Sequence, residues 1–124
     1  MKVHLSTEEI SLRLPVWAAL SQLFLDTCLT DEERHEIAAV IRQAGLSADE
    51  AEAVLVDEVA PVFAPNLMSV AGEYVPWDQA QVAELVLAGL SKRGVLTNTI
   101  IGRWWRRRLA RLAWDDWQIV KRQC

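Results

Sequence analysis

Signals for the start of an α-helix recur along this chain. Three segments match the capping box: Ser6 to Glu9, Thr30 to Glu33 and Ser47 to Glu50. In this motif a hydroxyl accepts a hydrogen bond from the third helical N–H, and the Glu reaches back to the N–H of the cap. Asp78 to Gln81 is a looser version. Strands are not indicated, because no alternation of apolar and polar residues extends beyond four positions. The sequence therefore predicts an all-α protein.

The length of 124 residues predicts one domain, because two shorter pieces would each bury too little surface to be stable. We expect about five to six helices in a single compact domain spanning residues 1–124, with the apolar run from Val16 to Leu25 in the core. The expected spans are a first helix from Thr7 that kinks or restarts at Pro15, then Asp31 to Ala44, Ala48 to Ala60, Gln79 to Ser91, and a last and longest helix over Asn98 to Lys121.

The segment from Glu58 to Asp78 fits neither a simple helix nor a simple loop. Its part from Val59 to Gly72 carries no charge but contains Pro61 and Pro65. Each proline lacks an N–H and restricts the residue before it, so one regular helix is excluded. We expect an irregular, Pro-rich central segment covered by the helices, with the preceding helix ending before Pro61.

Charge is unevenly distributed along the chain. Residues 1–91 contain 4 Lys or Arg and 15 Asp or Glu, a net charge of −11, and residues 92–124 contain 9 and 2, a net charge of +7. An acidic body of this kind is either a solvated surface with helix caps or a docking face for a basic protein, where complementary charge accelerates association. The candidate partner-binding acids are Asp31, Glu32, Glu36, Asp49 and Glu52.

The last expected helix has a basic side and an apolar side when its residues are placed about 100° apart. The apolar side comprises Ile101, Trp105, Leu109, Leu112, Ile119 and Val120, with Asp116 among them and Trp117 at the margin of the other side. The basic side comprises Arg103, Arg107, Arg111 and Trp114. It either contacts nucleic-acid phosphates or an anionic membrane surface, or pairs with the acidic body. We favour internal pairing, because an overall acidic protein repels polyanions.

A third candidate surface is the turn before the fourth capping signal. Its partner-binding candidates are Glu73, Tyr74, Trp77 and Asp78, near Asn66. Aromatic residues beside carboxylates are typical of a recognition loop. The same residues fit a polar clasp that satisfies backbone groups which the prolines leave unpaired, and we slightly favour the clasp.

Patterns that carry chemistry are scarce. His35 is followed by Glu36, but Ala39 and Val40 stand where a zinc-protease helix would place its second His. The five glycines are scattered and form no phosphate loop, and the two cysteines, Cys28 and Cys124, give no disulfide or metal-ligand spacing. We expect no enzyme activity, metal or cofactor. We also expect a cytoplasmic location, since no apolar run approaches the ~18 residues of a membrane span.

Three segments together resemble a family of small bacterial proteins of unknown function: LPVWAALSQLFLDT (Leu14 to Thr27), EVAPVFAPNL (Glu58 to Leu67) and AGEYVPWD (Ala71 to Asp78). The resemblance covers about residues 8–90 and leaves the basic tail outside. The chain departs from the pattern at Cys28, where the family has an acid. It also has Tyr74, Pro76 and Trp77 where the family has Trp, Gly and Phe. Small, acidic, helical proteins of this kind resemble immunity proteins that neutralise antibacterial toxins.

The resulting hypothesis is a binding protein that inhibits a cognate protein, such as a toxin domain, by covering its basic active site. The acidic body, the missing catalytic motifs and the six Trp residues motivate it. One alternative is a nucleic-acid-associated accessory protein that uses the basic helix. The other is a homodimer that buries the excess apolar surface.

Overall fold

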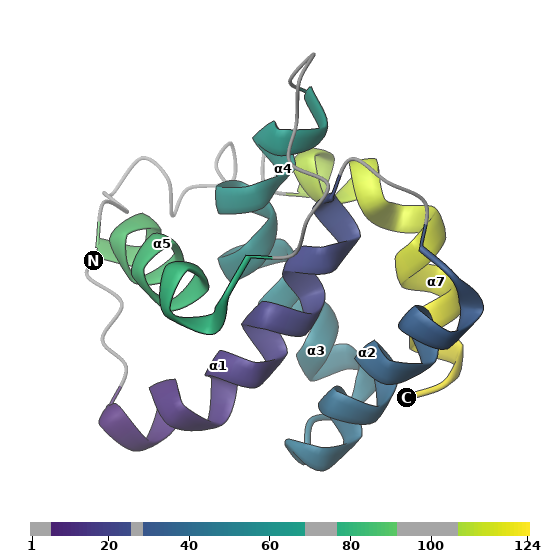
Figure 1. Cartoon of the computed structure of the whole chain (residues 1–124), viewed down its shortest axis with the longest axis horizontal. Coiled ribbons are helices and arrows are strands. Elements are labelled where there is room, and N and C mark those ends of the chain that lie inside the picture. The colour runs from purple at the N-terminus through teal and green to yellow at the C-terminus, as the bar shows by residue number, and fades with distance from the viewer. Residues whose placement is uncertain (1–5, 26–28, 69–76, 92–106) are drawn as a thin grey trace.

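Every regular element in the described part of the chain is a helix (Figure 1). The computed structural model describes residues 6–25, 29–68, 77–91 and 107–124. Its elements are α1 (Thr7–Ser21), the 3₁₀ turn η1 (Gln22–Phe24), α2 (Asp31–Gln43), α3 (Ala48–Val54), the π-helical segment η2 (Leu55–Val59), α4 (Ala60–Met68), α5 (Gln79–Ser91), the 3₁₀ turn η4 (Arg111–Ala113) and α7 (Trp114–Arg122). The prediction of a single all-α domain is confirmed.

Helices α1, α2, α3 and α5 start where the sequence places them, and the expected start at Asn98 lies outside the described residues. The hydroxyl groups of Ser6, Thr30 and Ser47 each accept a hydrogen bond from the backbone N–H of the Glu three residues later. The side chain of that Glu in turn accepts a hydrogen bond from the backbone N–H of the capping residue. At α5 the Gln81 N–H donates to Asp78 Oδ1 at 2.8 Å, and the Asp78 N–H donates to Gln81 Oε1 at 3.3 Å. All four capping predictions are confirmed, because the motif satisfies local backbone donors whatever the helix packs against.

The centre of the molecule is α1, which runs through the middle of Figure 1 with α5 on one side and α2 and α7 on the other. It continues through Pro15 as one helix, so the alternative of a second helix starting there is wrong. Its second half supplies much of the core, including the fully buried Val16, Trp17 and Leu20. The prediction that the run from Val16 to Leu25 lies in the core is confirmed, because its large apolar side chains are buried.

The helix that starts at Ala48 does not end before Pro61. α3, η2 and α4 form one helical run that contains both prolines of the expected irregular segment. Within it, the Ala60 N–H donates to the carbonyl of Leu55, five residues earlier. A proline has no N–H to donate and its ring collides with the carbonyl four residues before it. The wider π turn directly before Pro61 accommodates both effects, so the run is continuous but not regular.

The expected helix over Asn98 to Lys121 is broken in its described part, since η4 separates residues 107–110 from α7. The predicted apolar side is also partly wrong. Leu112 is 47% exposed and Trp117 is fully buried. The buried side contains the small residues Ala110 and Ala113, and η4 contacts both α4 and η1. Small side chains allow a close approach between helices, and a hydrophobicity pattern gives them little weight.

Helices α4 and α5 also approach closely. A Cβ at Gly89 would lie 2.8 Å from Val62 Cγ2. Gly89→Ala should lower the free energy of unfolding by about 1 kcal/mol, because overpacking against a β-branched residue outweighs the ~1 kcal/mol helix preference of Ala. In a Val62→Ala background the same change should raise it by about 0.5–1 kcal/mol. Urea unfolding of the wild type, the two single variants and the double variant measures this, and equal effects in both backgrounds would contradict it.

Candidate functional site

Glu52 on α3 holds α7 against the helical run. Its Oε1 accepts hydrogen bonds from Trp117 Nε1 and Lys121 Nζ, both at 2.9 Å. Asp49 lies 3.8 Å from the same ammonium group. Partial burial raises the pKa of the Glu52 carboxyl. The hydrogen bonds from Trp117 and Lys121, with the charges of Lys121 and Arg107, outweigh that effect and leave the pKa below its ordinary value. We call Glu52, Trp117 and Lys121 the α7 anchor.

Glu58 on η2 holds α1 in the same way. Glu58 Oε1 accepts from Trp17 Nε1 at 2.8 Å, and Glu58 Oε2 accepts from Arg13 Nη1 at 2.5 Å. The Glu58 side chain is only 12% exposed, and the Trp17 side chain is fully buried. We call Glu58, Trp17 and Arg13 the α1 anchor.

The two anchors share a sequence pattern that sequence analysis missed. Each uses a Trp and a basic residue four positions apart on one helix, Arg13 with Trp17 and Trp117 with Lys121. Residues at this spacing lie on the same side of a helix and can reach one acceptor. Trp17 and Trp117 are therefore structural residues, and the six Trp residues give less support to an aromatic binding surface than expected.

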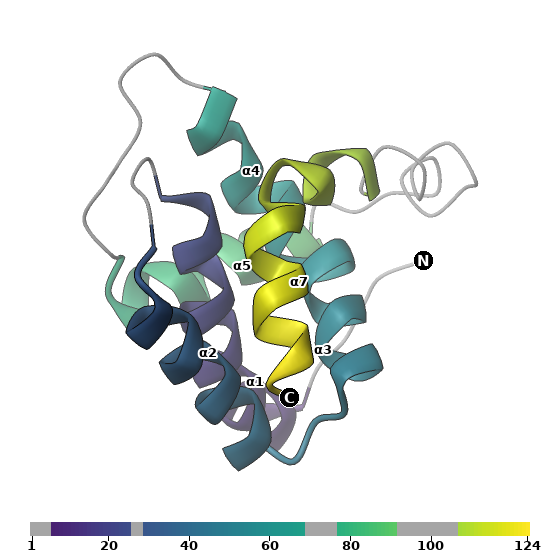
Figure 2. The same ribbon diagram turned by 90° about the vertical axis from the view of Figure 1, so that its right-hand side faces the viewer.

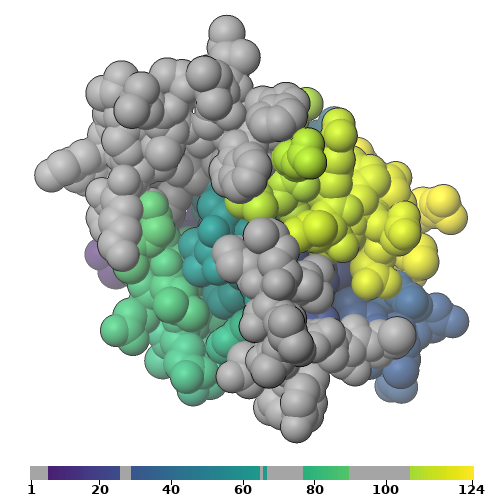
Figure 3. Space-filling view, turned by 90° about the horizontal axis from the view of Figure 1, so that it is seen from above, coloured from purple at the N-terminus to yellow at the C-terminus, as the bar shows by residue number. Residues whose placement is uncertain are grey.

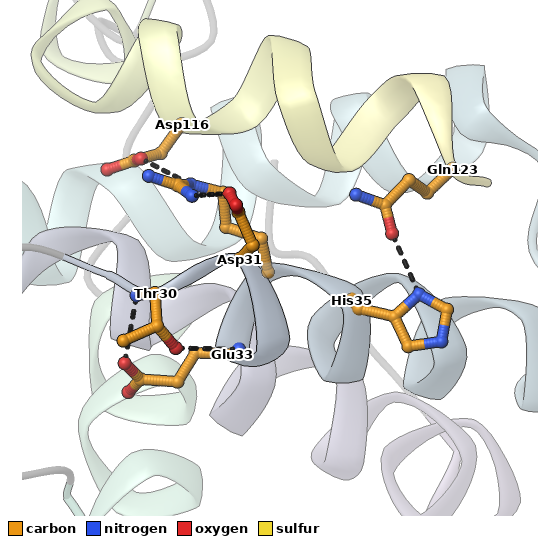
Figure 4. Close-up of polar contacts among 7 residues, drawn as sticks. Thr30, Asp31, Glu33, His35, Asp116 and Gln123 are labelled. Atoms are coloured by element: carbon orange, nitrogen blue, oxygen red, sulfur yellow. Dashed lines mark hydrogen bonds and ion pairs between the residues drawn. The ribbon is translucent and has the colours of Figure 1, made fainter.

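α7 also forms polar contacts along α2 (Figure 4). Arg34 donates from Nε to Asp116 Oδ1 at 3.0 Å and from Nη1 to Asp31 Oδ1 at 2.6 Å. Near the end of the chain, His35 Nδ1 lies 2.9 Å from Gln123 Oε1. Asp116, which falls among the apolar residues of the expected helix, is therefore paired with Arg34. Figure 2 shows α7 between α2 and α3, so these contacts and the α7 anchor hold it on both sides.

The predicted acidic surface separates into two groups. Glu52 belongs to the α7 anchor, and Asp49 is 93% exposed beside Lys121. The other three acids lie on α2 and are all exposed: the Asp31 side chain is 99% exposed, Glu32 follows it directly, and Glu36 lies one turn after Glu32 on the same side of the helix. Among the described residues, Glu32 and Glu36 form no hydrogen bond or ion pair. We call Asp31, Glu32 and Glu36 the acidic face of α2.

The turn before α5 has a structural role in its described part. Trp77 is half-buried against the core and its ring centroid lies 4.7 Å from that of Phe63. Asp78 caps α5. Asn66 Nδ2 donates to the carbonyl of Phe24 at 2.8 Å, so it fastens α4 to the end of η1. These contacts are structural, but they do not decide between the clasp and the recognition loop. Glu73 and Tyr74 lie outside the described residues.

The basic side is not neutralised as expected. Arg107 and Arg111 are exposed and form no ion pair with a described residue, although Arg107 lies near enough to Glu52 to lower its pKa. In the described part of the chain, Lys121 pairs with the acidic body, whereas Arg107 and Arg111 do not. Trp114 is half-buried against the core, so it is not a free stacking surface. The yellow-green atoms in Figure 3 show that this segment contributes to the surface. Arg103 lies outside the described residues.

Two further features bear on the class of site. Within residues 6–25, 29–68, 77–91 and 107–124, His, Cys, Asp and Glu side chains form no group of three that could hold a metal ion. In the same ranges, no helix has both the length and the apolar character needed to cross a membrane.

The comparisons with known proteins give a family without a known activity. A family model described as a domain of unknown function (DUF7079) matches residues 11–123. This range includes the basic tail, so the expectation that the tail lies outside the shared pattern is wrong. No curated protein matches the chain, and no solved structure does.

Proposed function

The chain belongs to the DUF7079 family, a domain of unknown function, and we propose that it is a non-enzymatic protein-binding module. In this proposal it is an immunity protein that covers the basic active surface of a cognate toxin with the acidic face of α2. The proposal includes action in the bacterial cytoplasm, which the resemblance to small bacterial proteins supports.

The supporting observation is the exposed pair of Glu32 and Glu36. Like charges four residues apart on a helix lower its stability by about 0.2–0.5 kcal/mol. Glu32 lies in the first turn, where the helix dipole favours an acid, but Glu36 lies beyond it. In contrast, Glu33 and Glu50 serve capping boxes, and Glu52 serves the α7 anchor. The pair has no corresponding role in the described structure, which supports a role in binding.

The setting of α2 suits a rigid docking surface. Arg34 and His35 fasten α2 to α7, and Ile37 and Ile41 are buried in the core. A face that is fixed before binding loses little conformational freedom on association, and a basic partner is attracted to it over a long range. The face can cover a basic active site without any chemical step.

The proposal is tested with the protein encoded beside this gene. The toxicity of that protein is measured in cells that produce either the wild-type chain or its Glu32→Gln/Glu36→Gln variant. Its affinity for each of the two purified chains is measured as well. We expect the variant to lose protection and to bind about tenfold or more weakly, with most of the loss in the association rate at low salt.

The matched control is Glu8→Gln/Glu84→Gln, which removes the same charge from exposed positions on α1 and α5. It should protect and bind like the wild type. Equal weakening of both variants would show an effect of net charge alone. The proposal would be contradicted if the wild-type chain did not reduce the toxicity of the neighbouring protein.

A further inference from the structure

A second charged surface remains, and it has the opposite sign. The described C-terminal segment, residues 107–124, contains five basic and two acidic residues, a net charge of +3. Arg107 and Arg111 lie one turn apart at its start, both exposed, with the 47% exposed Leu112 beside them. We call Arg107, Arg111 and Leu112 the basic ridge.

The core beneath the ridge keeps it in place. Leu109, Ala110 and Ala113 alternate with the ridge residues and are buried, and the α7 anchor fixes the helix that follows. The guanidinium groups therefore project from a packed support. Their placement needs no partner, and their charges are available to one.

The composition of the ridge distinguishes between two kinds of partner. A stable protein interface buries about 800 Å² on each side around an apolar centre, whereas Leu112 is the only large apolar residue that the described part of the ridge exposes. Binding to nucleic-acid phosphates needs only cations at the surface, because the affinity comes from the release of counterions. Trp114 is half-buried against the core, which limits the ring surface that it offers for stacking on bases, so a contact through the backbone fits best.

We infer that the basic ridge binds the phosphate backbone of double-stranded DNA without sequence preference. This surface is separate from the acidic face of α2 and does not depend on the proposed function. At physiological salt, dissolved ions screen charges that are more than about 8 Å apart. The acidic body therefore repels DNA only weakly at the ridge, and the local charge of the ridge decides whether DNA binds there.

Fluorescence anisotropy of a labelled duplex with the full chain tests the inference at several salt concentrations. Wild type should bind weakly, with an affinity that falls steeply as salt rises. Arg107→Gln/Arg111→Gln should reduce the affinity about tenfold or more at low salt and lower the salt slope by about one for each arginine. Circular dichroism and unfolding midpoints should match those of wild type, because both side chains are exposed.

Arg122→Gln is the control for Arg111→Gln, since it removes the same charge from an exposed position at the far end of α7. It should leave the salt slope unchanged. The inference is overturned if the wild type fails to bind the duplex at low salt, or if both single variants lose affinity equally. It is also overturned if poly-glutamate displaces the duplex as well as unlabelled DNA does, which would indicate an acidic protein as the partner.

Discussion

Replacing Glu58 with Ala will lower the free energy of unfolding by about 2–4 kcal/mol. The change leaves the indole N–H of the fully buried Trp17 without its acceptor and leaves Arg13 without its counterion. Removing one member of a fully buried pair costs about 3–5 kcal/mol, and the estimate is lower here because the Arg13 side chain is 30% exposed. Urea unfolding followed by circular dichroism measures the difference.

Two variants separate the α1 anchor from a general effect of removing charge. Glu58→Gln keeps an oxygen that can accept from Trp17 but removes the charge that faces Arg13. The loss in the free energy of unfolding should therefore be about half of that in Glu58→Ala. Glu84→Ala removes an exposed acid from α5 and should change the stability by less than about 0.5 kcal/mol. A loss at Glu58 no larger than that at Glu84 would show that the anchor contributes nothing to stability.

Acid will destabilise the protein through Glu52, and Glu52→Gln will remove that part of the pH dependence. The pKa of Glu52 lies below its ordinary value of 4.5 in the folded state. Its contribution is therefore fully present above the unfolded pKa and is lost as the pH falls through the lower folded pKa. At neutral pH, where this contribution is complete, Glu52→Gln should lower the stability by about 1–2 kcal/mol.

Unfolding midpoints from neutral pH down to the acid range measure this effect. The wild type and Glu52→Gln curves should converge as the carboxyl is protonated. Part of the acid sensitivity should remain in the variant, because the capping hydrogen bonds to Thr30 and Ser47 also hold the pKa of Glu33 and Glu50 below their ordinary value. Curves that stay parallel down to the most acid pH would mean that the charge of Glu52 does not stabilise the fold.

The sequence predicted only part of the candidate site. Exposure of Glu32 and Glu36 follows from the helical pattern of α2, in which Ile37, Ala38 and Ile41 face the core. Glu52 stands in the same acidic body, and no local signal distinguishes it from these two. Its role depends on Trp117 and Lys121, which lie 65 and 69 residues later in the chain. A one-dimensional pattern cannot rank such distant partners.

For a similar reason, Arg107 and Arg111 do not form the expected ion pairs with the acidic body among the described residues. The net charges of the two parts of the chain favour pairing between them, but they do not decide which residues meet. The packing of α7 between α2 and α3 brings Lys121 to Glu52 and Asp116 to Arg34, and leaves Arg107 and Arg111 at the surface. Charge balance between segments therefore predicted the attraction and not the contacts.

The sequence alone determined the helical class and the starts of α1, α2, α3 and α5, because a capping box satisfies N–H groups within four residues and needs no distant partner. It also determined the core role of the second half of α1. The tertiary structure decided how the chain passes Pro61, where α7 begins, and which Trp and Glu residues form the anchors. Those outcomes depend on the space and the hydrogen-bond partners that neighbouring helices provide, and these exist only after the helices have packed.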